Sequence, residues 1–169
     1  QIRAIDPDHT KATQGIFSTS PGAGVSMTTA FIDQVIGSHR LRTVSAVGET
    51  FPLYCTANGK AYLSSLDEPA IEQLIGKSYE ARTPNTLTKL PALLAELRTV
   101  RKTGIAYDRE EHTLGICAVG VALHDPLGNA VAISVPVPSQ RFREQQRLIA
   151  ERLLATKHAM LADWSAAAA

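Results

Sequence analysis

Two apolar runs in the second half of the chain alternate large and small side chains with a period of two. They cover residues 116–123 and 130–135, and the turn sequence Asp125-Pro126-Leu127-Gly128 joins them. Successive side chains of a strand point to opposite faces, so these residues can be sorted by parity. The sorting predicts an antiparallel hairpin whose bulky face packs under helices. That face carries Cys117, Val119, Val121, Leu123, Val131, Ile133 and Val135.

The opposite face of this hairpin is almost bare. It carries Ala118, Gly120, Ala122, Ala130, Ala132 and Ser134. A bare face either meets a closely apposed element or lines a cavity with room for a ligand. The pattern leaves both possibilities open.

A second informative segment, residues 51–65, reads FPLYCTANGKAYLSS and predicts an extended stretch that turns into a helix. Thr56 is the natural N-cap, which puts Ala57, Asn58 and Gly59 in the first turn. The first N–H groups of a helix lack internal partners, so a small acidic ligand could bind there. Lys60 would add a positive charge nearby.

The alternative is an ordinary capped amphipathic helix in which Ala61, Leu63 and Leu66 pack inward and Lys60 faces water. The segment is not a P-loop, because Tyr54 and Ala61 occupy positions where that motif needs glycine and serine or threonine.

The rest of the chain reads as a mixture of strands and helices. Residues 16–20 and 25–36 suggest a hairpin around a Pro-Gly-Ala-Gly turn, and residues 41–47 suggest a third strand. Asp67 with Pro69 should start a short helix that reaches Ile75. Thr86 or Thr88 should cap a longer helix that Gly104 ends. Residues 140–164 predict a long amphipathic helix whose stripe is Phe142, Ile149, Leu153, Met160 and Trp164.

Composition limits the classes of function. With 169 residues and 44% hydrophobic content, we expect a single domain over residues 1–169. The 17 basic and 16 acidic residues give a formal charge of +1, which offers no footprint for nucleic acid. The sequence has no candidate membrane span or signal peptide, so a cytoplasmic protein is expected. Cys55 and Cys117 have neither disulfide nor zinc spacing.

Four separated segments resemble the C-terminal effector-binding domain of IclR-type transcription regulators. They are GETFPLYCTANGKAYLSSL (48–66), LRTVRKTGIAYD (97–108), REEHTLGICAVGVALHDPLGNAVAISVPVP (109–138) and the final helix, together about residues 33–164. The resemblance implies an α+β fold, a curved antiparallel sheet flanked by helices and related to GAF domains. It also implies an N-terminal winged helix-turn-helix domain, which we expect to be absent from this chain.

The resemblance implies a ligand site beside the sheet. Ala118 takes a position where many relatives have cysteine, and Pro136 replaces a frequent serine. Parity points Cys117 away from the site, although a one-residue bulge would reverse this. The implied ligand-binding residues are Ala57, Asn58, Asp108, Ile116, Ala118 and Ser134, an apolar wall of Leu41, Val44, Phe51 and Leu53, and Cys117 as the alternative to Ala118.

Several polar residues have simpler interpretations. Asp108 could accept a hydrogen bond from a ligand hydroxyl or serve as a turn residue. His112 is better read as ordering its loop than as a metal ligand, because paired ligands are missing. A thiolate dyad of Cys117 and His112 has no identifiable third residue. We expect no catalytic residue, no metal and no cofactor.

The expected function is that of a sensor. The domain would bind a small organic acid and bias an attached DNA-binding domain through the conformation of a homodimer or homotetramer. It would contact DNA only through that domain and would not contact a membrane. The alternatives are an oligomerisation module without a working pocket and, less favoured, a cysteine-dependent enzyme.

Overall fold

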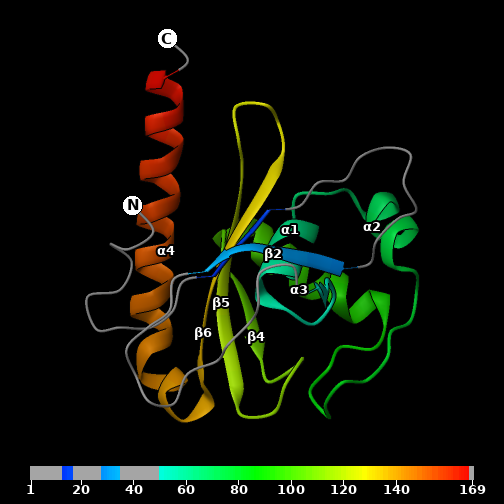
Figure 1. Cartoon of the computed structure of the whole chain (residues 1–169). Helices are drawn as coiled ribbons and strands as arrows, with labels where there is room; N and C mark the ends of the chain where they lie inside the picture. The colour runs from blue at the N-terminus through cyan, green and yellow to red at the C-terminus, as the bar shows by residue number, and fades with distance from the viewer. Residues whose placement is uncertain (1–12, 17–27, 35–49, 168–169) are drawn as a thin grey trace.

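The computed structural model describes residues 13–16, 28–34 and 50–167 (Figure 1). Within these ranges six strands form one antiparallel sheet in the order β3-β2-β1-β6-β5-β4, which confirms the predicted α+β fold. The strands are β1 Thr13–Ile16, β2 Thr28–Gln34, β3 Thr50–Pro52, β4 Ala106–Arg109, β5 Ile116–His124 and β6 Ala130–Pro138. The helices are α1 Ala57–Leu63, α2 Glu68–Ile75, α3 Leu90–Thr103 and α4 Ser139–Ala167.

The hairpin predicted by parity is confirmed as β5 and β6. Its register runs without interruption from Ile116 opposite Pro138 to His124 opposite Ala130. The Asp125 carboxylate closes the turn by accepting hydrogen bonds from the Leu127 and Asn129 N–H groups, at 2.9 and 2.8 Å. The bulky face forms one core with the α4 residues Phe142, Ile149 and Leu153, so this end of α4 belongs to the core, as expected.

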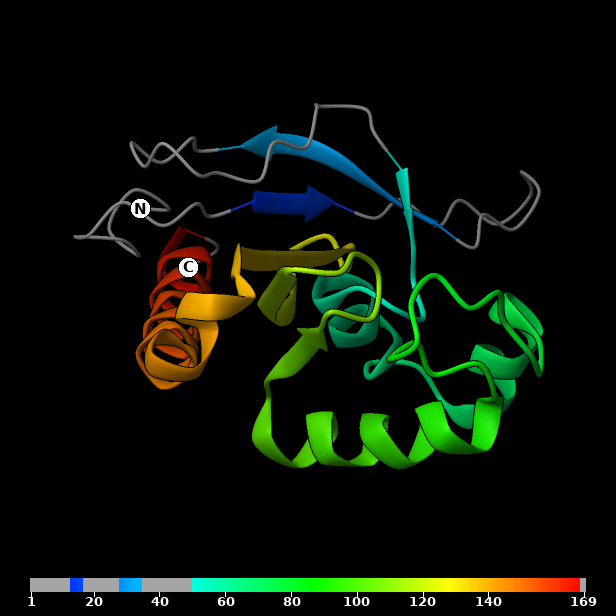
Figure 2. The same ribbon diagram turned by 90° about the horizontal axis from the view of Figure 1, so that it is seen from below.

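The bare face of the hairpin meets α1. A β-carbon added at Gly120 would lie 2.8 Å from the carbonyl carbon and oxygen of Ala57, and 3.0 Å from the Asn58 nitrogen. Close packing is therefore the correct alternative at Gly120. In the view of Figure 2, α1 lies between the sheet and α3, while α4 packs on the other face of β5 and β6.

The N-terminal hairpin joins the same sheet. β1 and β2 are antiparallel, as predicted, and β1 also pairs with β6, so that Thr13 lies opposite Ser134. The first strand was predicted at residues 16–20 and is observed at Thr13–Ile16. The predicted turn and the predicted strand at 41–47 lie outside the described residues.

Helix boundaries follow the predicted signals with one exception. Asp67 caps α2 by accepting the Ala70 N–H at 2.8 Å, and Gly104 ends α3 with a φ of 75°. The predicted threonine cap of α3 is wrong, because Lys89 is the N-cap and makes no side-chain cap bond. The Thr86 hydroxyl is instead engaged by the loops around it, as described below. No helix among the described residues is long and apolar enough to cross a membrane.

Candidate ligand-binding site

The start of α1 is capped as predicted by Thr56. Its hydroxyl accepts the Gly59 N–H at 3.3 Å and donates to the Pro52 carbonyl at 2.8 Å. The first-turn N–H groups of Ala57 and Asn58 have no acceptor within the helix. Since α1 has only seven residues, its dipole is a small contribution, and side chains must supply much of any ligand binding.

Asn58 carries an unusual polar atom. Its side chain is 3% exposed, and its amide Nδ2 has no hydrogen-bond partner among the described residues. Leaving a buried donor unpaired costs about 1–3 kcal/mol. Such a donor, next to N–H groups that have no acceptor within the helix, is suited to an acceptor supplied by a bound molecule.

The strand register gathers further residues on the same face. Asp108, Ala118 and Pro136 lie side by side across β4, β5 and β6. Gly120 and Ser134 form another row of this face, and Gly120 is the residue on which the helix start rests. Two-residue periodicity gives these residues a common face, and α1 covers it.

Asp108 is 6% exposed, and its Oδ1 accepts the Glu111 N–H at 2.8 Å. Burial raises the pKa of this carboxyl to about 7, and the nearby Glu111 carboxylate adds to the rise, while hydrogen bonds and Lys60 oppose it. Near neutral pH the group exists in both forms. It can therefore donate a hydrogen bond when protonated and accept one when ionised.

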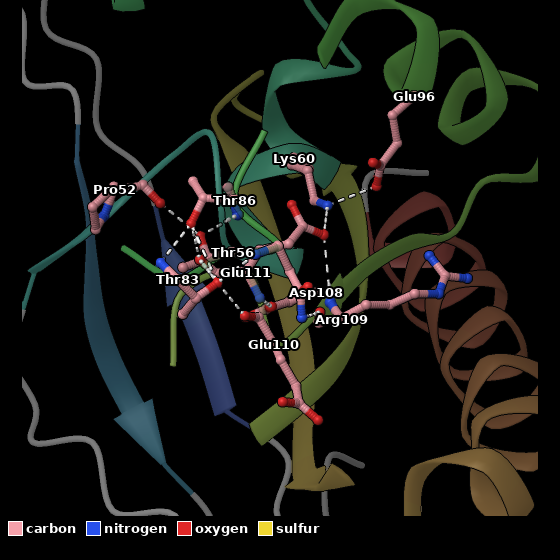
Figure 3. A network of polar contacts seen from close by, with 12 residues as sticks. Pro52, Thr56, Lys60, Thr83, Thr86, Glu96, Asp108, Arg109, Glu110 and Glu111 are labelled. Carbon is pink, nitrogen blue, oxygen red and sulfur yellow. Dashed lines mark hydrogen bonds and ion pairs between the residues drawn. The ribbon is translucent and has the colours of Figure 1, made fainter. Parts of the chain in front are cut away.

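Lys60 is completely buried, contrary to the interpretation that it faces water. Its ammonium lies 2.5 Å from Glu111 Oε1 and 2.6 Å from Glu96 Oε1 (Figure 3). Neither glutamate was predicted as a site residue, because no local pattern shows that Glu96 on α3 or Glu111 after β4 reaches Lys60.

Comparison with known proteins identifies the domain. Residues 23–161 match the family described as bacterial transcriptional regulator IclR C-terminal. The chain belongs to this family.

Individual relatives agree with the family assignment. The chain is 50% identical over 124 residues to the HTH-type transcriptional regulator Rv1719 of Mycobacterium tuberculosis, covering 73% of this chain and 48% of that protein. It is 32% identical over 126 residues to the HTH-type transcriptional regulator TtgV of Pseudomonas putida, covering 75% and 48%. The chain thus spans about half the length of these curated relatives.

The fold is shared with a crystal structure of a transcriptional regulator, RHA06195, from Rhodococcus sp. RHA1. The TM-score is 0.84 at 18% identity, and the match covers 98% of this chain and 67% of that chain. The names of these relatives describe regulators rather than enzymes.

The other residues predicted to bind the ligand lie in different surroundings. Ile116 shares the parity of Ala118 and is half-buried at the start of β5. Leu53 is buried in the core between α1, α2 and α3. Phe51 is half-buried, and its ring packs edge to face on the His112 ring, with the two ring centroids 5.1 Å apart. Leu41 and Val44 lie outside the described residues.

Cys117 faces away from this site. It belongs to the α4-side core, and the uninterrupted β5–β6 register contains no bulge that would turn it round. Cys117 and Ala118 therefore lie on opposite faces of the sheet, as the parity of the sequence predicted.

The surroundings of Cys117 and His112 do not favour a thiolate dyad between them. Burial first, and Glu110 second, raises the pKa of Cys117 to about 11, so its thiol is protonated at neutral pH. The His112 ring contacts Phe51, and its Nδ1 lies 2.8 Å from the Thr113 hydroxyl, which agrees with a loop-ordering role. In the described part of the chain, no three histidine, cysteine or acidic residues group as metal ligands.

Proposed function

We propose that this chain is the single effector-binding domain of an IclR-type transcription regulator and that it binds a small organic acid. The observation that carries the proposal is the buried Nδ2 of Asn58 at the capped start of α1, which has no hydrogen-bond partner among the residues that the structure describes. The family membership supports a regulatory role. No step of covalent chemistry is part of the proposal.

The ligand would lie beside the start of α1, over the row of the sheet that carries Asp108, Ala118 and Pro136, because α1 already packs directly on Gly120. Its carboxylate would accept hydrogen bonds from the Ala57 and Asn58 N–H groups and from the Asn58 amide. Asp108 would meet a ligand hydroxyl or carbonyl, and Ser134 would supply a further hydroxyl. Ala118 and the half-buried Ile116 would limit the size of the ligand.

Regulation would follow from different ligand affinities in two arrangements of a homodimer or homotetramer. An attached winged helix-turn-helix domain would read that arrangement as a change in DNA binding. The relatives that share this domain are about twice as long and are named HTH-type regulators, which supports such an attachment. The domain itself, with a formal charge of +1, would leave DNA contact to its partner domain.

The test is thermal unfolding of the domain with acetate, pyruvate, benzoate and gluconate, followed by calorimetry. A ligand at about 100 times its dissociation constant should stabilise the domain by about 2.7 kcal/mol. Asn58→Leu should abolish the shift. It should leave the free protein as stable as before or more stable, because it removes an unpaired polar group.

Gln145→Leu is the matched control. Gln145 lies on α4 and also carries a buried amide atom without a partner among the described residues. We expect this variant to bind normally, since α4 covers the opposite face of the hairpin. Unchanged affinity in Asn58→Leu would refute the helix-start contact, and no saturable shift with any acid would favour a pure oligomerisation module.

A further inference from the structure

The segment that carries Asp108 is held from two sides (Figure 3). From α1, the Lys60 ammonium contacts the Glu111 carboxylate at 2.5 Å. From the loop before α3, the Thr86 hydroxyl donates to the Glu111 carbonyl and the Thr83 hydroxyl donates to the Glu110 carbonyl, both at 2.6 Å. The segment between these contacts is thus fixed at both its backbone and its side chains.

The backbone of this segment is strained. Glu110 has a φ of 60°, which is a left-handed conformation that a residue with a side chain adopts rarely. Strain of this kind persists only where the surrounding structure imposes it, and it concentrates at functional sites. Here the imposing contacts are those of Lys60, Thr83 and Thr86.

Lys60 is poorly placed for a direct role with an anion. Its ammonium is fully buried and already meets two carboxylates, of which Glu111 is itself buried and Glu96 is 26% exposed. Burying an ion pair in this way gives little net stability, because desolvation offsets the attraction. The cluster therefore needs an explanation other than stability or ligand charge.

We propose that Lys60 and Thr86 are positioning residues of the ligand site, acting through Glu111 to hold the Asp108 carboxyl in its buried position. The link is the Glu111 N–H, which donates to Asp108 Oδ1 at 2.8 Å. This proposal rests on the proposed function, since a positioned Asp108 matters only if the site binds a ligand.

Positioning and simple charge have opposite effects on Asp108. As a charge, Lys60 lowers the pKa of Asp108, whereas holding the carboxyl out of water raises it. The titratable groups that interact with Asp108 include Glu111 from the segment that follows β4, Lys60 from α1, Cys55 before α1 and Cys117 from β5. Removing Lys60 therefore distinguishes the two roles by the direction in which the pKa of Asp108 changes.

The experiment is an NMR titration of the Asp108 side-chain carboxyl in the ligand-free protein. If Lys60 positions Asp108, Lys60→Met frees the carboxyl into water, and its pKa falls from about 7 toward the ordinary range of an aspartate. If Lys60 acts only as a charge, the pKa rises. A rise or no change overturns the proposal for Lys60.

Thr86→Val provides a second variant that removes no charge and keeps the shape of the side chain. We expect it to lower the pKa of Asp108 as well, and an unchanged titration would overturn the role of Thr86. This measurement stands if Lys60→Met fails to fold. Glu96→Gln is the control, because it leaves the Lys60–Glu111 contact in place and should change the pKa of Asp108 much less than either variant.

Ligand binding is measured separately, with whichever of acetate, pyruvate, benzoate or gluconate stabilises the wild type. We expect Lys60→Met and Thr86→Val each to weaken that affinity by about tenfold or more, and Glu96→Gln by much less. If no acid binds the wild type, the proposed function fails while the Asp108 titration still decides whether these residues position it. If an acid binds and both variants bind it equally well, the positioning proposal fails alone.

Discussion

Replacing Gly120 by alanine tests whether the start of α1 rests on β5. The new β-carbon would lie 2.8 Å from the Ala57 carbonyl carbon and oxygen and 3.0 Å from the Asn58 nitrogen. Carbon atoms pack best at about 3.5–4.0 Å, so the backbone at the helix start would have to withdraw by about 0.7 Å or more. Overpacking of this kind costs about 1–3 kcal/mol.

The expected sign makes this substitution informative. Glycine to alanine in an unstrained strand usually stabilises by about 0.4–1 kcal/mol, because the unfolded chain loses freedom. We therefore expect a net loss of about 1–2 kcal/mol in the free energy of unfolding, measured by urea titration with an unchanged slope. We also expect weaker binding of any acid that stabilises the wild type, since Asn58 moves.

Gly128→Ala is the control for this substitution. Gly128 lies in the hairpin turn with a φ of 84°, and in the described part of the chain no packing neighbour lies within 4 Å of an added β-carbon. The control should lose about 1–2 kcal/mol through backbone strain alone, leaving the amide resonances of Ala57 and Asn58 in place. If Gly120→Ala is as stable as the wild type, or if those two resonances do not move, the contact between α1 and β5 is refuted.

Two further substitutions examine individual side chains. Because the pKa of Asp108 is raised to about 7, this group favours the folded state most below pH 4, and that contribution is lost as the pH rises to 7. Asp108→Asn should remove this decline in the free energy of unfolding, which is at most about 1.4 kcal/mol per pH unit. If the free energies of unfolding of the two proteins, measured by urea titration, change in parallel with pH, the reasoning is contradicted. Cys117→Ser should destabilise by about 1–3 kcal/mol through a polar group in the α4-side core, without changing acid binding. If Cys117→Ser instead loses acid binding while remaining as stable as the wild type, Cys117 faces the site.

The parts of the fold that were predictable from the sequence depend on local patterns. The two-residue period of β5 and β6 fixes which side chains share a face, and the cap residues Thr56, Asp67 and Gly104 act within one helical turn. A threonine cap for α3 was mispredicted because the Thr86 hydroxyl makes its hydrogen bonds outside α3. This hydroxyl accepts the Arg82 and Thr83 N–H groups within its own loop and donates to the Glu111 carbonyl, 25 residues away in sequence, which only the folded chain brings near.

The candidate site, like the fold, was predictable where local patterns decide and not where distant residues do. Parity placed Ala118 and Ser134 on one face and Cys117 on the other, and the register agrees. Parity could not show whether that face was filled, because the answer depends on how closely α1 approaches Gly120. Lys60 was misjudged for a related reason, since its burial depends on glutamates 36 and 51 residues away in sequence.

The charges of the site have a consequence for the ligands it can hold. Two carboxylates neutralise the Lys60 ammonium, and burial keeps much of Asp108 protonated near neutral pH. The described part of the site therefore offers a carboxylate neutral donors, the N–H groups of the helix start and the Asn58 amide, rather than a free cation. Hydrogen bonds from fixed neutral dipoles are directional and are screened little by salt. An acid bound in this way should be selected by shape, with an affinity that changes little with ionic strength.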